Sequence, residues 1–146
     1  MTLSSQYDPR YLAGIVFFNS GDYFSAHEVW EDLWRDCDHE SRRFYQGLIQ
    51  AAVSIYHAIR GNRSGASRLF HSARRYMSAY PSPHLGFDGH SFWNAMAEAM
   101  SEFLLESSVD PQVQIDLIPR MDLNPLPTGW PDPEAILHAT EDRQEL

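Results

Sequence analysis

The chain has 146 residues, of which 43% are apolar and 13% aromatic, so it is long enough and apolar enough to fold as one domain with a hydrophobic core. Its 20 acidic and 11 basic residues leave a net charge of −9, which argues against a binder of nucleic acid or of acidic membranes. A single cysteine excludes an intramolecular disulfide, and no segment approaches the roughly 20 apolar residues of a membrane span or has the form of a secretory signal. We therefore expect a cytoplasmic protein.

Apolar residues recur at helical spacing in five segments, each bounded by residues that begin or end helices. Asp8 followed by Pro9 is a typical helix start, and Asp22 is the expected cap of the next helix. The third helix is apolar almost all round, which is typical of a central, buried helix. The expected helices cover residues 9–19, 23–37, 41–60, 64–79 and 90–106.

An imperfect internal repeat relates the second and fourth expected helices. Residues 21–33 and 61–73 share the order glycine, small residue, aromatic residue at an offset of 40 positions. The pattern predicts an all-α bundle of two stacked helical hairpins, similar to tetratricopeptide repeats, with a fifth helix added. The alternative is that any helical hairpin favours the same order of residues.

The composition changes after residue 107. Six prolines follow, and they exclude one long helix. Residues 113–117 alternate as in a short strand, and Asp132 can begin a final short helix. We therefore expect an all-α domain at residues 1–107 and a Pro-rich, acidic extension at residues 108–146. The extension should pack over the domain, with its last residues frayed.

The most informative motif lies on the second expected helix. His27, Glu31 and Trp34 stand at H-x-x-x-E-x-x-W spacing, which places all three on one helical face. The same face carries Tyr23 and Trp30, which we expect to be buried. An imidazole and a carboxylate in such a setting are expected to be partly buried and to need polar partners.

A polar stripe on the third expected helix offers such partners. If the second and third helices form an antiparallel hairpin, Glu31 lies level with Gln46 and His27 lies level with Gln50. The sequence therefore predicts a polar cluster between the two helices that binds a ligand. Its candidate residues are His27, Glu31, Trp34, Gln46, Gln50 and His57.

Four functions remain open for this cluster. His27 and Glu31 are the candidate catalytic residues of an acid–base site, because a carboxylate beside an imidazole orients it. They could also hold a divalent metal with His57, but His57 lies roughly 9–10 Å beyond Gln50 along the helix, so no metal is expected. The third is a buried His27–Glu31 pair that only locks the two helices together. The fourth is an adaptor surface that binds a protein partner. The expected partner is a small molecule or a protein, with no nucleic acid, no membrane and no evident cofactor.

Three sequence blocks, taken in order, resemble a prokaryotic family known as domain of unknown function 309. They are residues 18–34 with the H-x-x-x-E-x-x-W signature, residues 46–50 (Q-G-L-I-Q), and residues 56–66, which begin Y-H and end G-N-x-x-G-A. The resemblance covers roughly residues 9–80 and implies a small all-α domain. It implies no activity, because none is assigned to the family, and it does not extend to the Pro-rich tail.

Overall fold

A computed structural model describes residues 7–105 and 108–145 of the chain. Over these residues the regular structure is helical, with two isolated β-bridges and no strand, which confirms the predicted all-α fold. None of the described helices is both long and apolar enough to cross a membrane. The elements are α1 (Pro9–Asn19), α2 (Tyr23–Asp36), α3 (Arg42–Ile59), α4 (Arg63–Ser78), α5 (Gly89–Ala99), α6 (Ser101–Leu104), the 3-10 turn η2 (Ile115–Leu117) and α7 (Pro133–Glu145).

Side-chain caps decide where the helices begin. The Asp8 carboxylate accepts a hydrogen bond from the Arg10 N–H at 2.8 Å, and the Asp22 carboxylate accepts one from the Ser25 N–H at 3.1 Å. Both caps were expected from the sequence. Asn62 caps α4 in the same way, so that helix begins at residue 63, one position earlier than predicted.

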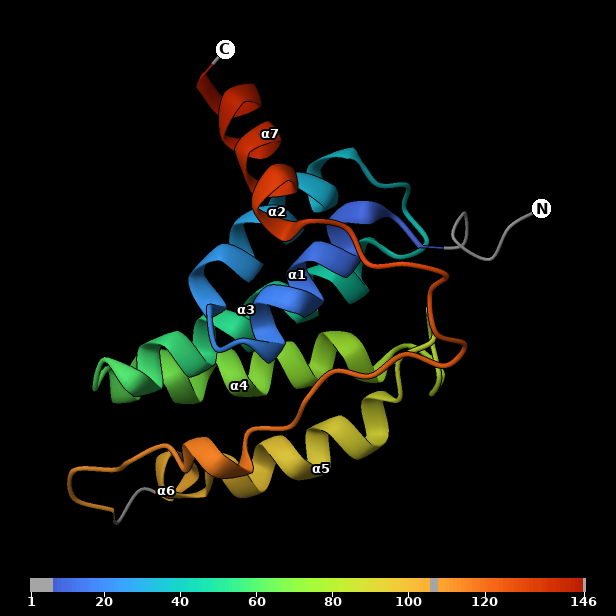
Figure 1. Ribbon diagram of the computed structural model, residues 1–146. Helices are drawn as coiled ribbons and strands as arrows, with labels where there is room; N and C mark the ends of the chain where they lie inside the picture. Colours follow the sequence, from blue (N-terminus) through green and yellow to red (C-terminus); the bar gives the residue numbers. More distant parts are fainter. Residues whose placement is uncertain (1–6, 106–107, 146) are drawn as a thin grey trace.

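The helices stack in chain order from α1 to α5, with α3 between α2 and α4 (Figure 1). Trp30 of α2 is completely buried, and its Nε1–H donates to the Tyr11 carbonyl of α1 at 3.2 Å. Ser54 of α3 donates to the Ala66 carbonyl of α4 at 2.6 Å. The arrangement agrees with the predicted bundle of stacked hairpins, and its likeness to tetratricopeptide repeats stays a prediction.

The fifth helix is shorter than predicted. Its last residue is Ala99, and the chain turns at Met100 into the single-turn helix α6. The Ala99 carbonyl accepts a hydrogen bond from the Gln114 N–H at 3.0 Å, so the returning tail takes an acceptor that a continuous helix would use itself. The turn buries Met100 completely and leaves Phe103 only 3% exposed.

The tail crosses the stack and returns to α1. Residues 113–117 form no strand, because the alternating segment finds no strand to pair with, and Ile115 is 63% exposed. Asn19 holds the tail through both polar atoms of its amide, which bond the N–H and carbonyl of Met121. The final helix α7 is longer than predicted and extends to Glu145, and the fraying of the last residues stays a prediction.

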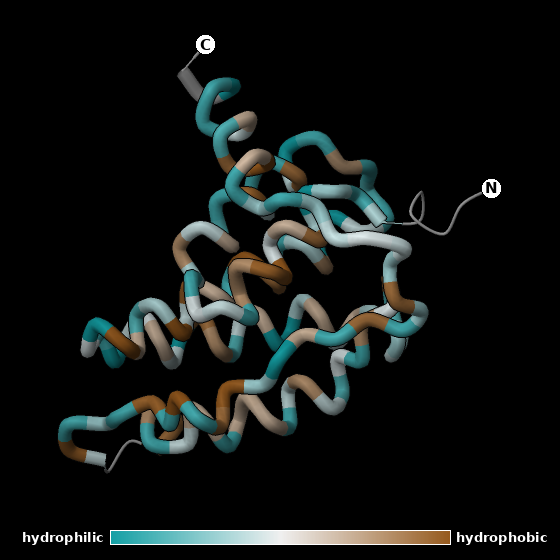
Figure 2. The backbone as a smooth tube through the Cα atoms, in the orientation of Figure 1, coloured by the Kyte–Doolittle hydropathy of each residue, from teal (hydrophilic) through white to brown (hydrophobic). Residues whose placement is uncertain are grey.

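The last helix packs against α1 and α2 with little apolar surface. Figure 2 shows α7 as largely hydrophilic, and Leu137 is its buried apolar side chain among the described residues. Polar contacts must therefore supply part of its docking. The division of the chain at residue 107 stays a prediction.

Candidate functional site

His27 and Glu31 form a partly buried pair on the outer side of α2. The His27 Nδ1 lies 2.8 Å from the Phe24 carbonyl, and its Nε2 lies 3.3 Å from a Glu31 carboxylate oxygen. The side chains are 21% and 39% exposed. An Nδ1–H that donates to the backbone fixes the ring and directs Nε2 at the carboxylate, so the ion pair is complete when the imidazole is protonated.

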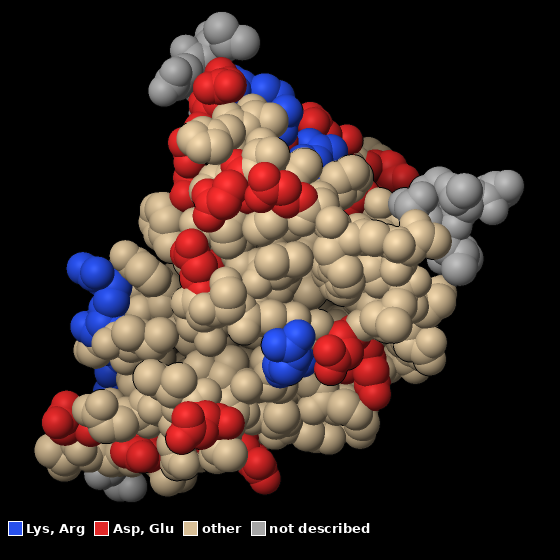
Figure 3. All heavy atoms as spheres, in the orientation of Figure 1, with Lys and Arg blue, Asp and Glu red and all other residues tan. Residues whose placement is uncertain are grey.

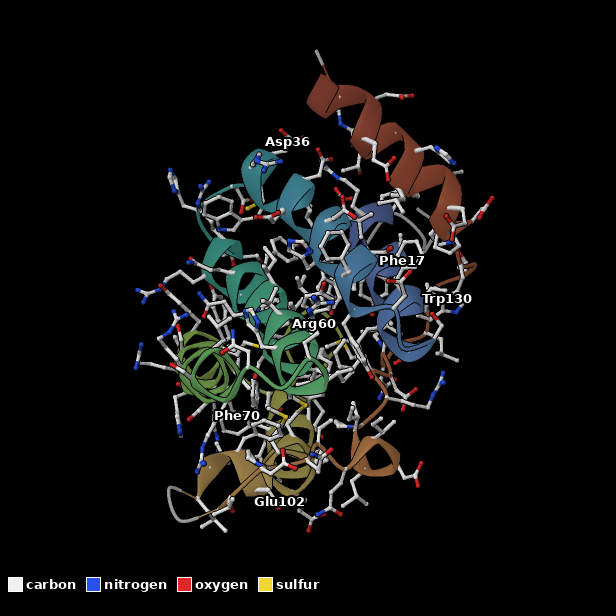
Figure 4. The ribbon with its side chains drawn as sticks, turned by 90° about the vertical axis from the view of Figure 1, so that its left-hand side faces the viewer. Phe17, Asp36, Arg60, Phe70, Glu102 and Trp130 are labelled. Carbon is white, nitrogen blue, oxygen red and sulfur yellow. The ribbon has the colours of Figure 1, made fainter. Side chains whose placement is uncertain are left out.

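The ring of Phe24 connects this pair to α3. Its centroid lies 5.1 Å from the His27 ring in an edge-on contact and 5.7 Å from the Tyr56 ring. Phe24 is nevertheless 49% exposed. The Arg60 guanidinium lies 5.3 Å from the Tyr56 centroid, at the end of α3 (Figure 4). Aromatic side chains therefore border the His27–Glu31 pair, and half of one of them remains open to solvent.

Trp34 marks the other end of the motif. The Arg42 guanidinium lies 4.0 Å above its ring centroid, a cation–π contact that joins the end of α2 to the start of α3. The Trp34 Nε1 is buried and has no hydrogen-bond partner among the described residues. The α2–α3 face is therefore covered by an arginine at this end.

The glutamines and His57 do not join the pair. Within residues 7–105 and 108–145, no hydrogen bond links His27 or Glu31 to Gln46, Gln50 or His57. The Gln50 Oε1 is buried without a partner, and His57 accepts from Asn62 at 3.1 Å in the turn between α3 and α4. Their participation in one binding site stays a prediction.

The metal-ligand candidates are not gathered. No group of three His, Cys, Asp or Glu side chains in the described part of the chain is arranged to hold a metal ion. His57 is instead bound locally by Asn62, the residue that also caps α4. His27 and Glu31 alone provide two ligands, fewer than a structural or catalytic zinc site uses.

Carboxylates dominate the electrostatics next to the pair. Burial raises the pKa of Glu28, and Glu141 of α7 raises it further, while the adjacent His27 opposes the shift. Figure 3 shows acidic residues gathered over α7 and the region beneath it. This part of α2 is therefore suited to a cationic group rather than an anion.

Sequence reasoning missed Phe24, Glu28 and Tyr56 as members of this surface. A signal was present, because Phe24, His27, Glu28 and Glu31 follow the i, i+3, i+4, i+7 spacing of one helical face. We define the Phe24 surface by six residues, which are Phe24, His27, Glu28 and Glu31 of α2 with Tyr56 and Ile59 of α3.

The region that carries the site matches a known family. The family model described as "Domain of unknown function (DUF309)" matches residues 11–69, which confirms the resemblance seen in the sequence. The chain is 37% identical over 75 residues to the uncharacterized protein YpuF of Bacillus subtilis (strain 168). It is 38% identical over 52 residues to an uncharacterized protein of Aquifex aeolicus (strain VF5). The matches cover 50% and 34% of this chain, but only 43% and 16% of the two relatives.

Proposed function

We propose that the Phe24 surface is a docking site for a segment of another protein, one that offers an apolar side chain next to a basic one. The observation that carries this proposal is the position of Phe24. Its ring is held between His27 and Tyr56 and is still 49% exposed. A fixed, half-exposed aromatic ring loses little conformational freedom on binding, which is typical of the residues that dominate protein interfaces.

Apolar area extends from Phe24 onto α3. Ile59 is 50% exposed and lies one helical turn beyond Tyr56, on the same side of α3. An apolar side chain of the partner would cover Phe24 and Ile59 together. The His27–Glu31 pair would lie at the edge of this contact and direct hydrogen bonds to the partner.

The charge of this surface indicates that the partner also carries a basic side chain. Among the described side chains, His27 is the only one that pairs with Glu31, which leaves most of that carboxylate available. Burial raises the pKa of Glu28, and the neighbouring carboxylate of Glu141 raises it further, so a cation brought to this position would be favourable. A lysine or arginine of the bound segment would supply that cation, and the net charge of −9 would attract it over longer distances.

A small-molecule or acid–base site is less well supported. Small ligands are held in concave pockets, and five cavities of the molecule are lined by residues other than His27 and Glu31. The fixed His27 ring could transfer a proton, but no hydroxyl or thiol group of the described residues lies within hydrogen-bond distance of it.

The test is selection of random peptides displayed on phage against the protein. We expect selected peptides to pair Lys or Arg with Leu, Phe or Trp. Their binding should be lost with Phe24→Ala and weakened about tenfold with Glu31→Gln, as for loss of a partly desolvated ion pair. Ile115→Ala is the matched control, because it removes an apolar side chain that is 63% exposed at a distant site.

Two results would contradict the proposal. One is a selection that enriches no such peptides, or peptides that bind the Phe24→Ala variant as tightly as the wild type. The other is spermidine alone binding as tightly as the peptides, which would indicate a small amine as the ligand. Phe24 is exposed, so its replacement should leave the fold intact.

A further inference from the structure

We infer that a cavity between α4, α5 and the loop at residues 79–88 binds a small carboxylic acid with an apolar or aromatic body. The cavity has a volume of about 310 Å³, the size of a pocket for a small organic ligand. It lies apart from the Phe24 surface, and the inference is independent of the function proposed there.

The walls of the cavity are apolar and come from four parts of the fold. Phe44 of α3, Met77 of α4, Phe87 of the loop and Trp93 of α5 line it, and each is at most 5% exposed. Aromatic walls of this kind suit a ligand with an aromatic ring or a short branched chain. Burial of such a group would provide most of the binding free energy.

The polar part of the lining contains one guanidinium. Arg74 lines the cavity together with His90 and the hydroxyl-bearing side chains Ser78, Tyr80 and Ser82, and no aspartate or glutamate lines it. The Arg74 side chain is exposed and makes no ion pair within the described residues, so its guanidinium is available to a carboxylate.

Asp88 lies next to the lining, between the lining residues Phe87 and Gly89 in the chain. Asp88 accepts hydrogen bonds from the hydroxyls of Ser82 at 2.7 Å and Ser91 at 2.8 Å. These bonds lower the pKa of Asp88 to about 2. Asp88 also caps α5, because its carboxylate accepts a hydrogen bond from the Ser91 N–H at 3.2 Å. Its charge is therefore partly balanced by the N-terminus of α5.

The walls are fixed before a ligand arrives. His84 and Phe87 exchange two backbone hydrogen bonds at 3.0 and 2.9 Å, and Phe87 is bridged to Leu123 of the tail. Trp93 packs edge-on against Phe70 with the ring centroids 5.3 Å apart. A preformed cavity costs little ordering on binding. Most of its lining lies beyond residue 69, outside the family match, so the site would be a property of this chain rather than of the family.

The experiment compares phenylacetate with its uncharged amide, phenylacetamide. Binding is followed by the indole N–H signal of Trp93 in nitrogen–proton NMR spectra, assigned with Trp93→Phe. We expect phenylacetate to shift this signal saturably with a Kd on the order of 1 mM, a normal value for a ligand of this size. Arg74→Gln should weaken the binding of phenylacetate about tenfold. Phenylacetamide should bind the wild type more weakly than phenylacetate does, and its affinity should be the same for Arg74→Gln.

Two control variants locate the site. Arg75→Gln removes the neighbouring arginine, which does not line the cavity, and should change phenylacetate binding less than about twofold. Ser78→Phe places a ring in the lining and should abolish binding. The inference is overturned if the Trp93 signal does not respond, if the two arginine variants weaken binding equally, or if phenylacetate still binds Ser78→Phe.

Discussion

The carboxylate of Asp32 on α2 is bound by the guanidinium of Arg143 on α7, although the two residues stand 111 positions apart. Arg143 donates from Nε at 3.3 Å and also from Nη2, while Arg10 of α1 donates to the same carboxylate at 2.9 Å. The Asp32 side chain is only 9% exposed. The last helix is thus attached to α1 and α2 through one buried acid.

Removal of this acid should cost more stability than removal of its exposed partner. Asp32→Ala should lower the free energy of unfolding by about 1–3 kcal/mol, because it removes the nearly buried acceptor that Arg10 and Arg143 share. Arg143→Gln should cost about 1 kcal/mol or less, since the Arg143 side chain is 48% exposed. Urea unfolding of the three proteins checks this, and an equal cost for both variants would contradict it.

The same carboxylate should make stability depend on pH. Burial alone would raise the pKa of Asp32, but hydrogen bonds from Arg143 and Arg10 outweigh burial and hold the pKa below its ordinary value of 3.8. An unfolded chain therefore takes up the proton first as pH falls. The contribution of Asp32 should be complete above the ordinary value and be lost as pH falls through the lower, folded one.

Thermal unfolding between about pH 2 and pH 6 measures this effect, because the interval brackets the usual range of an aspartate. The Tm of the wild type should fall more steeply toward acid pH than that of Asp32→Asn, which has no titrating group at this position. Parallel curves for the two proteins would show that another acid is responsible.

The His27–Glu31 pair should contribute little to stability. A buried lock between α2 and α3 would cost about 3–5 kcal/mol when Glu31 is replaced. Because Glu31 is 39% exposed and pairs within its own helix, we expect Glu31→Gln to change the free energy of unfolding by less than about 1 kcal/mol. A loss of about 3–5 kcal/mol, measured by urea unfolding, would instead support the hypothesis that the pair locks the two helices together.

Close packing of α1 on α2 depends on a glycine. A Cβ atom at Gly14 would overlap the buried indole of Trp30, whereas a Cβ atom at Gly89 meets nothing within 4 Å. Gly14→Ala should therefore lower the free energy of unfolding by about 1–3 kcal/mol, as for an overpacked core. Gly89→Ala is the matched control and should be close to neutral. Equal Tm values for the two variants would contradict this account.

Local chemistry explains which parts of the fold were predictable. Asp8 and Asp22 bond N–H groups two or three residues away, so the helix starts follow from neighbouring residues. The burial of Trp30 follows from helical periodicity in the same way. The break at Met100 was not predictable, because it depends on Gln114 returning to the Ala99 carbonyl.

For the same reason, only part of the candidate site could be predicted from the sequence. The His27–Glu31 contact lies within one helical turn, and the spacing of the motif predicted it. The contact of Phe24 with Tyr56 joins two helices, so it required the relative rotation of α2 and α3, which is a result of packing.

The sequence by itself determined the all-α class, the caps and the positions of the first four helices within one or two residues, because these depend on interactions between near neighbours. Only the tertiary structure decided that α7 docks through Asp32 and that Phe24 stays half exposed. It also decided that Arg74 meets an apolar cavity. Those features arise where segments far apart in the chain come into contact, and no local pattern encodes how such segments are oriented.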